Sequence, residues 1–346
     1  MYRRLALIRI SRLAVLVAAV ALGAAACSSG TPTTPPSTPG ASSAPVSHAP
    51  ATPAPSLSST PAPSAPASAP ASAAVVATVP SDQLEFAGKL VICSDIPYPP
   101  QEFFDASGNP IGSDIEIAQG IAQRLGLTPV IQNSVFDTII AALQGGKCDI
   151  IASAQNITAD RVLQVDMIPY FQAGQSFVVA TGNPAGITSK DSLCGKKIAA
   201  ETGTTEVDYL NGTGSYKGQG LSKACTAAGK PAITVTTFGK DSDALLALQT
   251  GKVDAYFADS PVAGYYTVQH PDEFALSGVV LGVALEGISV PQVTTADQSH
   301  KELEQGVQAA LVSMINDGSY MAILTKYGDQ DGAVTAADAG QINKTQ

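Results

Sequence analysis

From residue 82 onward the chain repeats one order of apolar and polar positions: a short apolar run, a polar loop, then apolar residues at helical spacing. Short apolar runs bounded by turn residues indicate buried strands, and spacings of three or four residues indicate amphipathic helices. The expected strands cover 89–93, 130–132, 150–153, 197–200, 233–236 and 255–258. The expected helices cover 113–125, 136–144, 204–210, 259–268, 298–316 and 320–327. Strands that alternate with helices predict an α/β fold with a parallel sheet.

The helix expected at 113–125 has the clearest start and end signals. Ser113 and Glu116 have the spacing of a capping box, in which each side chain bonds to the backbone of the other residue. Gly126 marks the end of this helix. The following strand contains Pro129, which has no N–H for a sheet, so we expect the strand to begin there.

One segment occurs twice in similar form. Residues 139–149 are IIAALQGGKCD and residues 244–254 are ALLALQTGKVD, at an offset of 105 residues. Each copy predicts the last turns of a helix, a Gly-Lys stop and an aspartate at the entrance of a strand. Two copies of one helix-to-strand unit predict two lobes of similar construction.

The first 26 residues have the features of an export signal. Four arginines precede an apolar run at 13–26 that is too short to span a bilayer. Small residues lead to Cys27, and this segment resembles the cleavage box of bacterial lipoproteins. We expect residues 1–26 to be a signal peptide and Cys27 to carry a lipid that anchors the exported protein to the outer face of the cell membrane. Secretion without a lipid is the alternative.

Residues 28 to about 80 are almost entirely Pro, Ala, Ser and Thr, with no Asp, Glu, Lys or Arg. This composition buries too little apolar surface to offset chain entropy, so residues 27–81 are expected to form a disordered tether. The whole chain has a formal charge of −10, and removal of the four signal-peptide arginines leaves −14. Such an acidic protein is not expected to bind nucleic acid.

Polar residues gather where the expected strands end. In open α/β sheets the ligand lies beyond the carboxyl ends of the strands. Arg161, Asp95 and Asp259 lie in or near these loops and could hold the carboxylate and the ammonium of an amino acid. No phosphate loop and no metal-protease motif is present in the sequence, and we expect no catalytic residue, metal or cofactor.

Several motifs resemble the family 3 extracellular solute-binding proteins of amino-acid ABC transporters. They are Gly88–Phe103, Gln144–Asp149, Asn156–Arg161 and Gly203–Thr205, in this order. The resemblance covers about residues 88–328 and implies an α/β, two-lobe, periplasmic-binding-protein-like (type II) fold. In that fold a ligand cleft lies between lobes that two hinge segments join. It also implies capture of a small amino acid or related zwitterion for an ABC permease, and we expect a monomer.

The expected division gives lobe I residues 82–180 and 286–330, lobe II residues 181–285, and a flexible tail at 331–346. Ligand should close the lobes about hinges near 172–181 and 285–291. An exported dehydratase-like enzyme on the same scaffold, with Glu201 as its acid or base, and a sensor that reports ligand without transport are the alternatives.

The resemblance also implies roles for individual residues. Arg161 matches the clamp on the ligand carboxylate and Asp259 the acceptor of its ammonium. The remaining matches are Thr204 or Thr205 beside the carboxylate, Ser153 and Asn156 as polar contacts, Tyr98 and Phe136 as the aromatic pair around the side chain, and Asp95 as its polar partner. Gln101 and Ser113 stand where the family usually has Phe. The alternatives are a surface ion pair for Arg161, a helix cap for Asp259 and loop packing for Tyr98.

The ligand class follows from Asp95. An aliphatic ligand would leave this carboxylate desolvated without a partner, which is costly. We therefore expect a basic or amide amino acid, and Glu201 would add a second negative charge if it faces the cleft.

Four cysteines follow Cys27. Cys194 and Cys225 flank the first helix of lobe II and are expected to form a disulfide in the oxidising exterior. Cys93 lies near the exit of one strand and Cys148 at the entrance of another. Parallel neighbours would hold these two about 15 Å apart, so we expect both to be unpaired.

Overall fold

A computed structural model describes residues 74–345. The expected signal peptide, the Cys27 lipid and most of the tether lie outside these residues. Residues 74–80 differ from the disordered tether expected there, because Val76 N donates to the Arg124 carbonyl at 2.8 Å and Val79 is buried in the core. Three valines in this stretch supply the apolar surface that the rest of the Pro/Ala/Ser/Thr segment lacks.

An eight-stranded sheet in the order β4-β1-β5-β10-β6-β9-β7-β8 runs through the described chain. Its strands are β1 (Lys89–Ser94), β4 (Thr128–Asn133), β5 (Ile150–Ile151), β6 (Val165–Ala180), β7 (Lys197–Glu201), β8 (Thr234–Phe238), β9 (Ala255–Asp259) and β10 (Phe274–Pro291). A separate hairpin pairs β2 (Phe103–Phe104) with β3 (Pro110–Ile111). The short strands pair in parallel within two groups, and β6 and β10 pair antiparallel along most of their length.

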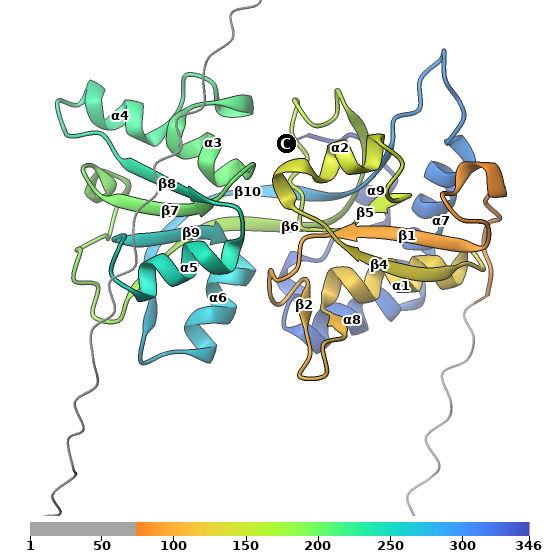
Figure 1. The fold of residues 1–346 in the computed structure, drawn as a ribbon, viewed down its shortest axis with the longest axis horizontal. Helices are drawn as coiled ribbons and strands as arrows, with labels where there is room; N and C mark the ends of the chain where they lie inside the picture. The colour runs from red at the N-terminus through yellow and green to blue at the C-terminus, as the bar shows by residue number, and fades with distance from the viewer. Residues whose placement is uncertain (1–73, 346) are drawn as a thin grey trace, which may run out of the picture. The chain divides into compact units, whose positions relative to one another are not determined.

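The two groups of strands form two lobes, and β6 and β10 cross from one to the other (Figure 1). Lobe I contains β1, β4 and β5, and lobe II contains β7, β8 and β9. The helices of lobe I are α1 (Ser113–Arg124), α2 (Ile139–Gln144), α7 (Lys301–Asp317), α8 (Ser319–Tyr327) and α9 (Ala336–Ala339). Those of lobe II are α3 (Thr205–Asn211), α4 (Leu221–Ala227), α5 (Asp241–Gln249) and α6 (Ser260–Gln269). Each lobe has buried apolar clusters of its own, which confirms the expected two-lobe α/β fold.

The sequence repeat corresponds to one structural unit used in each lobe. Asp149 accepts a hydrogen bond from Val91 N, and Asp254 accepts one from Lys197 N, so each aspartate bonds the strand beside the one it enters. The preceding glycines both have a left-handed backbone, with φ of 64° at Gly146 and 69° at Gly251.

The lobe boundary lies earlier on the first crossing strand than expected. Gln175 of β6 already pairs with Asp259 of β9, so the strand enters lobe II before residue 180. On the second crossing, the register of β10 against β6 shifts between Glu286 and Gly287. Because both crossings are continuous strands, no change of composition marks the boundary in the sequence.

Three local expectations differ from the structure. Ser113 does not cap α1, because its hydroxyl donates to Asp329 at 2.7 Å instead. Pro129 lies inside β4, opposite Leu90, which is possible because β4 is an edge strand. The helix expected at 136–144 is split into a 3-10 turn, Phe136–Thr138, and α2.

The expectation of unpaired Cys93 and Cys148 is wrong, because they form a disulfide with a Cα–Cα distance of 5.7 Å. The strands are parallel as expected, and Cys93 lies opposite Ile151. However, β5 is two residues long, and Cys148 belongs to the turn that descends from α2, a helix that contacts β1. The expected separation of about 15 Å assumed that Cys148 continues the direction of β5 at its entrance. The expected disulfide Cys194–Cys225 is present.

Replacing Cys93 and Cys148 together by alanine is expected to lower the free energy of unfolding by about 4 kcal/mol, because this bond closes a loop between residues 55 positions apart. The matched control is the Cys194/Cys225 double substitution, whose separation of 31 residues predicts about 3.5 kcal/mol. Urea denaturation measures both losses. A free thiol at Cys93 or Cys148 in the exported protein, found by peptide mapping, would contradict the pairing.

The C-terminal residues are packed and do not form the flexible tail expected at 331–346. Ala333 bridges to Phe171, and Val334 and Ala339 are buried in the core of lobe I. The Asn343 side chain accepts from Met167 N at 2.8 Å. The apolar residues here are too widely spaced to give a helical or strand pattern in the sequence. Within residues 74–345, none of the helices is long and apolar enough to cross a membrane.

Candidate functional site

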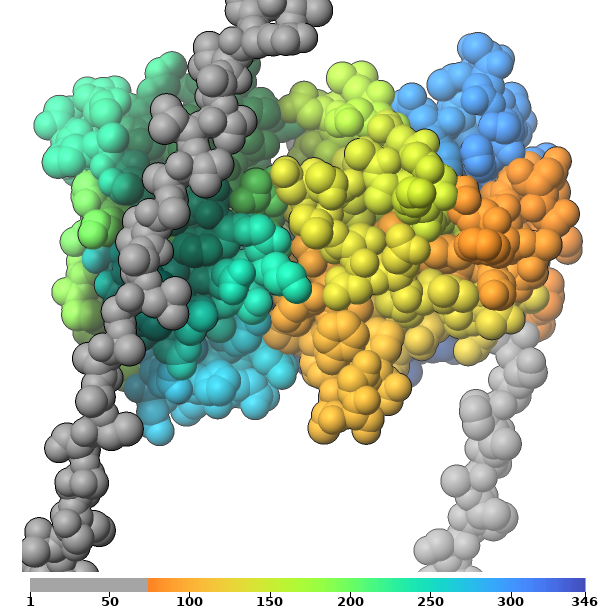
Figure 2. Space-filling view, in the orientation of Figure 1, coloured from red at the N-terminus to blue at the C-terminus, as the bar shows by residue number. Residues whose placement is uncertain are grey.

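The carboxyl ends of the parallel strands in each lobe point toward the other lobe (Figure 1), and residues at and after these ends line one small pocket. Its lining residues are Asp95, Tyr98, Glu102, Phe136, Ser153, Ala154, Asn156, Glu201, Thr204, Thr205, Glu206 and Asp259. All the predicted ligand residues except Arg161 are among them. Only about 10 Å³ is open to the centre of a water molecule, which is room for about one water. The atoms of the two lobes also meet on the molecular surface (Figure 2). An amino acid can therefore enter this closed pocket only if the lobes separate.

Arg161 lies against the pocket wall that Phe136 forms. The guanidinium carbon is 5.3 Å from the centre of the Phe136 ring. Nη1 donates to the Asn156 carbonyl at 2.9 Å, and Nη2 donates to the Gly203 carbonyl of the other lobe at 3.1 Å. The residue is only 9% exposed and forms none of the ion pairs found in residues 74–345. Burial lowers the pKa of Arg161. The surface ion pair considered from the sequence is absent here.

Asp259 is the last residue of β9, and only one of its two carboxylate oxygens accepts a hydrogen bond within the described residues. Oδ2 accepts a hydrogen bond from the Tyr98 hydroxyl at 3.0 Å, whereas Oδ1 is buried without a partner among the described residues. The side chain does not cap α6. Burial, followed by the charges of Glu206 and Glu286, raises the pKa of Asp259 well above its ordinary value. A cationic group at Oδ1 would both pair this oxygen and stabilise its charge.

Asp95 and Glu201 bring two carboxyl groups together from opposite lobes. Asp95 Oδ2 accepts from Phe136 N at 2.8 Å, and Glu201 lines the same pocket close enough for each carboxyl group to shift the pKa of the other. Burial raises the pKa of Asp95. Burial, followed by the charge of Asp95, raises the pKa of Glu201 to about 10. Glu201 therefore holds its proton at neutral pH.

Both predicted threonines already donate their hydroxyl hydrogen to oxygen atoms of the protein. Thr205 Oγ1 donates to Asn156 Oδ1 of the other lobe at 2.5 Å and accepts from Gln175 Nε2 at 2.8 Å. Thr204 Oγ1 donates to the Glu201 carbonyl at 2.7 Å. Asn156 Nδ2 is buried without a partner among the described residues, so it is a donor available to a ligand.

Ser153 joins two acidic residues of lobe I. Its hydroxyl accepts from Asp95 N at 2.9 Å and donates to Glu102 Oε1 at 2.8 Å. Glu102 also lines the pocket, and its Oε2 has no partner in residues 74–345. Burial, followed by the charge of Asp114, raises the pKa of Glu102 well above its ordinary value.

The departures at Gln101 and Ser113 have a structural explanation. Gln101 Nε2 donates to Glu286 at 2.7 Å, and Ser113 Oγ donates to Asp329 at 2.7 Å. Both carboxyl groups are buried, so an aromatic residue at 113 would leave Asp329 without a side-chain donor, and one at 101 would leave Glu286 with only the longer bond from the Tyr170 hydroxyl at 3.3 Å. The two polar residues therefore belong to a buried acidic network that this chain has beside the pocket.

Glu206 is a lining residue that the sequence did not reveal. It lies in the first turn of α3 and is 2% exposed, and its Oε1 has no partner in the described chain. An acidic residue in a first turn is common because it complements the helix dipole, so nothing marked it as a pocket residue. With Glu206 the lining contains five carboxyl side chains and no lysine or arginine. This balance favours a positively charged ligand.

A family model described as bacterial extracellular solute-binding proteins, family 3, matches residues 90–330. An arginine-binding protein from Corynebacterium glutamicum is 28% identical over 251 residues, which cover 72% of this chain and 77% of that protein.

Solved structures agree with the sequence matches. An ancestral arginine-binding protein bound to arginine has 33% identity and a TM-score of 0.60, with 69% of this chain and 98% of that chain covered. An ancestral amino-acid-binding protein, described as a precursor of cyclohexadienyl dehydratase, has 28% identity and a TM-score of 0.58, with 69% and 95% covered.

Proposed function

Because this chain belongs to the bacterial extracellular solute-binding proteins of family 3, we propose that it captures a basic amino acid, with L-arginine as the first candidate, and delivers it to an ABC permease. The observation that carries the proposal is the Asp95–Glu201 pair, in which two lobes place carboxyl groups together inside a closed pocket. A guanidinium can donate to both groups at once, and this electrostatic contact with both lobes would stabilise the closed state. The arginine-binding relatives support the same ligand.

In this proposal each end of the ligand has its own partners. Arg161 and the free Nδ2 of Asn156 bind the α-carboxylate, and the free Oδ1 of Asp259 accepts from the α-ammonium. Tyr98 and Phe136 flank the aliphatic side chain, and Asp95 with Glu201 bind its cationic end. Because these partners come from both lobes, ligand stabilises the closed state. Opening about the two crossing strands, β6 and β10, then lets the ligand in.

A ligand panel tests this function. Calorimetry with L-arginine, L-lysine, L-ornithine, L-histidine and L-glutamine should give the tightest binding for a basic amino acid, because only a cation neutralises Asp95 and Glu201 together. L-Glutamate and L-leucine serve as the acidic and aliphatic controls. If either control binds more tightly than every basic or amide amino acid, the ligand class is wrong. Mass spectrometry should recover the ligand unchanged, and conversion to a product would favour the dehydratase-like alternative.

The family is extracellular, and we propose that lipid on Cys27 holds the protein at the outer face of the membrane. The sequence at Ala24–Cys27 supports this. The intervening segment would let the lobes reach a permease in the same membrane. Metabolic labelling with a palmitate analogue should mark the natural protein, and a Cys27→Ser substitution should abolish the label. An unlabelled natural protein would indicate secretion without an anchor.

A further inference from the structure

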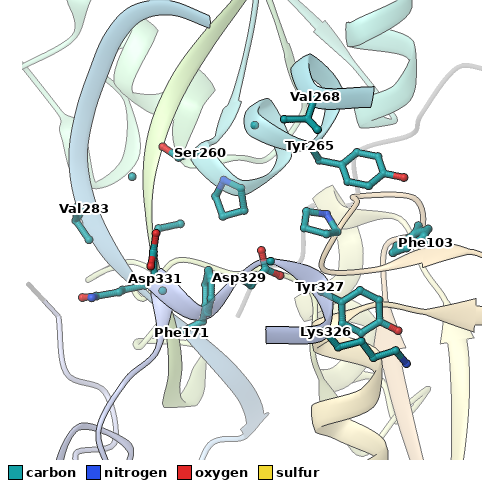
Figure 3. A pocket seen from close by; sticks show the side chains of 18 of the residues that line it. Phe103, Phe171, Ser260, Tyr265, Val268, Val283, Lys326, Tyr327, Asp329 and Asp331 are labelled. Carbon is teal, nitrogen blue, oxygen red and sulfur yellow. The ribbon is translucent and has the colours of Figure 1, made fainter. Parts of the chain in front are cut away.

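A second, larger cavity lies between the lobes beside the crossing strands (Figure 3). We call it the hinge groove. Lobe I contributes Phe103 and residues 326–332, lobe II contributes residues 260–269, and β6 contributes Phe171–Gly174. About 700 Å³ is open to the centre of a water molecule, compared with about 10 Å³ in the amino-acid pocket. This volume is within the usual range for small-molecule sites.

Aromatic rings from both lobes line the groove. Phe103 of lobe I lies 5.9 Å from Tyr265 of lobe II and 6.2 Å from Tyr327, measured between ring centres. Figure 3 shows these three rings on one side of the cavity. Faces and edges of such rings attract organic cations and pack against apolar groups. The ring pair across the lobes also means that an occupant would contact both lobes at once.

The groove has acidic groups without a matching cation. Asp329 lies between Phe171 and Tyr327 in Figure 3 and is only 5% exposed, and its one side-chain partner among the described residues is the neutral hydroxyl of Ser113. Asp331 adds an exposed carboxylate. The only cation among the lining residues, Lys326, is paired with Glu116.

We propose that the hinge groove is a second ligand site, which takes a small organic cation with its ammonium on Asp329 and its flat or apolar body against the rings of Phe103, Tyr265 and Tyr327. A buried carboxylate with a single neutral donor gains from a charged partner, and the rings exclude water from that contact. An uncharged body of the same shape would leave Asp329 uncompensated.

The buried acidic groups around Asp329 favour a positively charged partner for this carboxylate. Burial raises its pKa to about 7, the Ser113 hydroxyl opposes that rise, and the Asp114 charge from α1 adds to it. Glu286 of β10 is a further buried carboxyl group close enough for its pKa to respond to Asp329. A cation at Asp329 would also be attracted by the charge of Asp114. Because both lobes line the groove, its occupant and the amino acid would each favour the closed state and so tighten one another's binding.

Phenethylamine is a suitable probe because it joins one ammonium to one aromatic ring. Calorimetry on the full-length protein saturated with L-arginine should detect phenethylamine binding, which separates the groove from the amino-acid pocket. The neutral isostere 2-phenylethanol should bind at least about tenfold more weakly, since it cannot form the charge-assisted bond. Loss of phenethylamine binding when L-arginine is added would show that the probe had occupied the amino-acid pocket, and would overturn the proposal.

Two variants locate the probe. Asp329→Asn keeps the shape and the contact with Ser113 but removes the charge, so phenethylamine affinity should fall at least about tenfold. Asp272→Asn, an exposed aspartate after α6 and outside the groove, should change it less than about twofold. Equal phenethylamine binding by Asp329→Asn and the unsubstituted protein, equal binding of 2-phenylethanol and phenethylamine, or no phenethylamine binding at all would each overturn the assignment.

Discussion

Replacing Arg161 by alanine is expected to weaken L-arginine binding by about 2 to 5 kcal/mol, a loss of roughly 30-fold to 4,000-fold. The guanidinium is buried against Phe136, which lines the pocket. Without it, the ligand carboxylate would enter a pocket lined by carboxyl groups with no charged partner. Calorimetry measures the loss directly.

Arg161→Lys is the matched control, because it retains the charge but cannot make two parallel hydrogen bonds, so an intermediate loss is expected. Agmatine, which has the side chain of arginine but no carboxylate, should bind the unsubstituted protein and Arg161→Ala about equally. A fall in L-arginine affinity of less than about threefold in Arg161→Ala would remove this residue from the site.

The sequence predicted the parts of the fold that depend on local pattern. The repeated helix-to-strand unit placed Asp149 and Asp254 at equivalent strand entrances, and both bond the neighbouring strand as the repeat implies. The polar strand ends predicted most of the pocket lining, because the carboxyl ends of parallel strands meet at one edge. The residues that bind the ligand remain a proposal: Asp95 and Asp259 were expected from the strand ends, and the other predicted lining residues from the family resemblance.

Features that depend on tertiary packing were not predictable. The long strand β6 is buried along nearly all of its length and lacks the alternation of a half-exposed strand, whereas the burial of β10 alternates over residues 277–281 and is continuous over residues 285–290. Cys148 bonds to Cys93 because it lies in the turn that follows α2, and α2 contacts β1. Glu206 faces the pocket because of the orientation of α3, which the spacing of its own residues does not reveal.

L-Arginine binding is expected to release about one proton and to strengthen about tenfold for each pH unit between about pH 6 and 8. In the ligand-free pocket Glu201 holds a proton, because burial and the charge of Asp95 raise its pKa to about 10. A guanidinium between these groups favours both in the ionised form, which lowers that pKa. Because the free protein holds the proton and the complex does not, binding must strengthen as pH rises toward the pKa of the free pair. Calorimetry in buffers of different ionisation enthalpy counts the released proton.

The Glu201→Gln substitution removes the titratable carboxyl group but keeps the shape of the side chain. The amide can still bond to Asp95 but holds no exchangeable carboxyl proton, so the affinity for L-arginine should become nearly independent of pH over this range. The substitution should also reduce affinity at pH 8, because one of the two charges that face the guanidinium is lost. Asp241→Asn is the control, since Asp241 is buried near Glu201 and has a pKa raised to about 8 by burial, but does not line the pocket. If Glu201→Gln kept the tenfold dependence and Asp241→Asn removed it, the proton would come from Asp241, and Asp95 with Glu201 would no longer explain the preference for a cation.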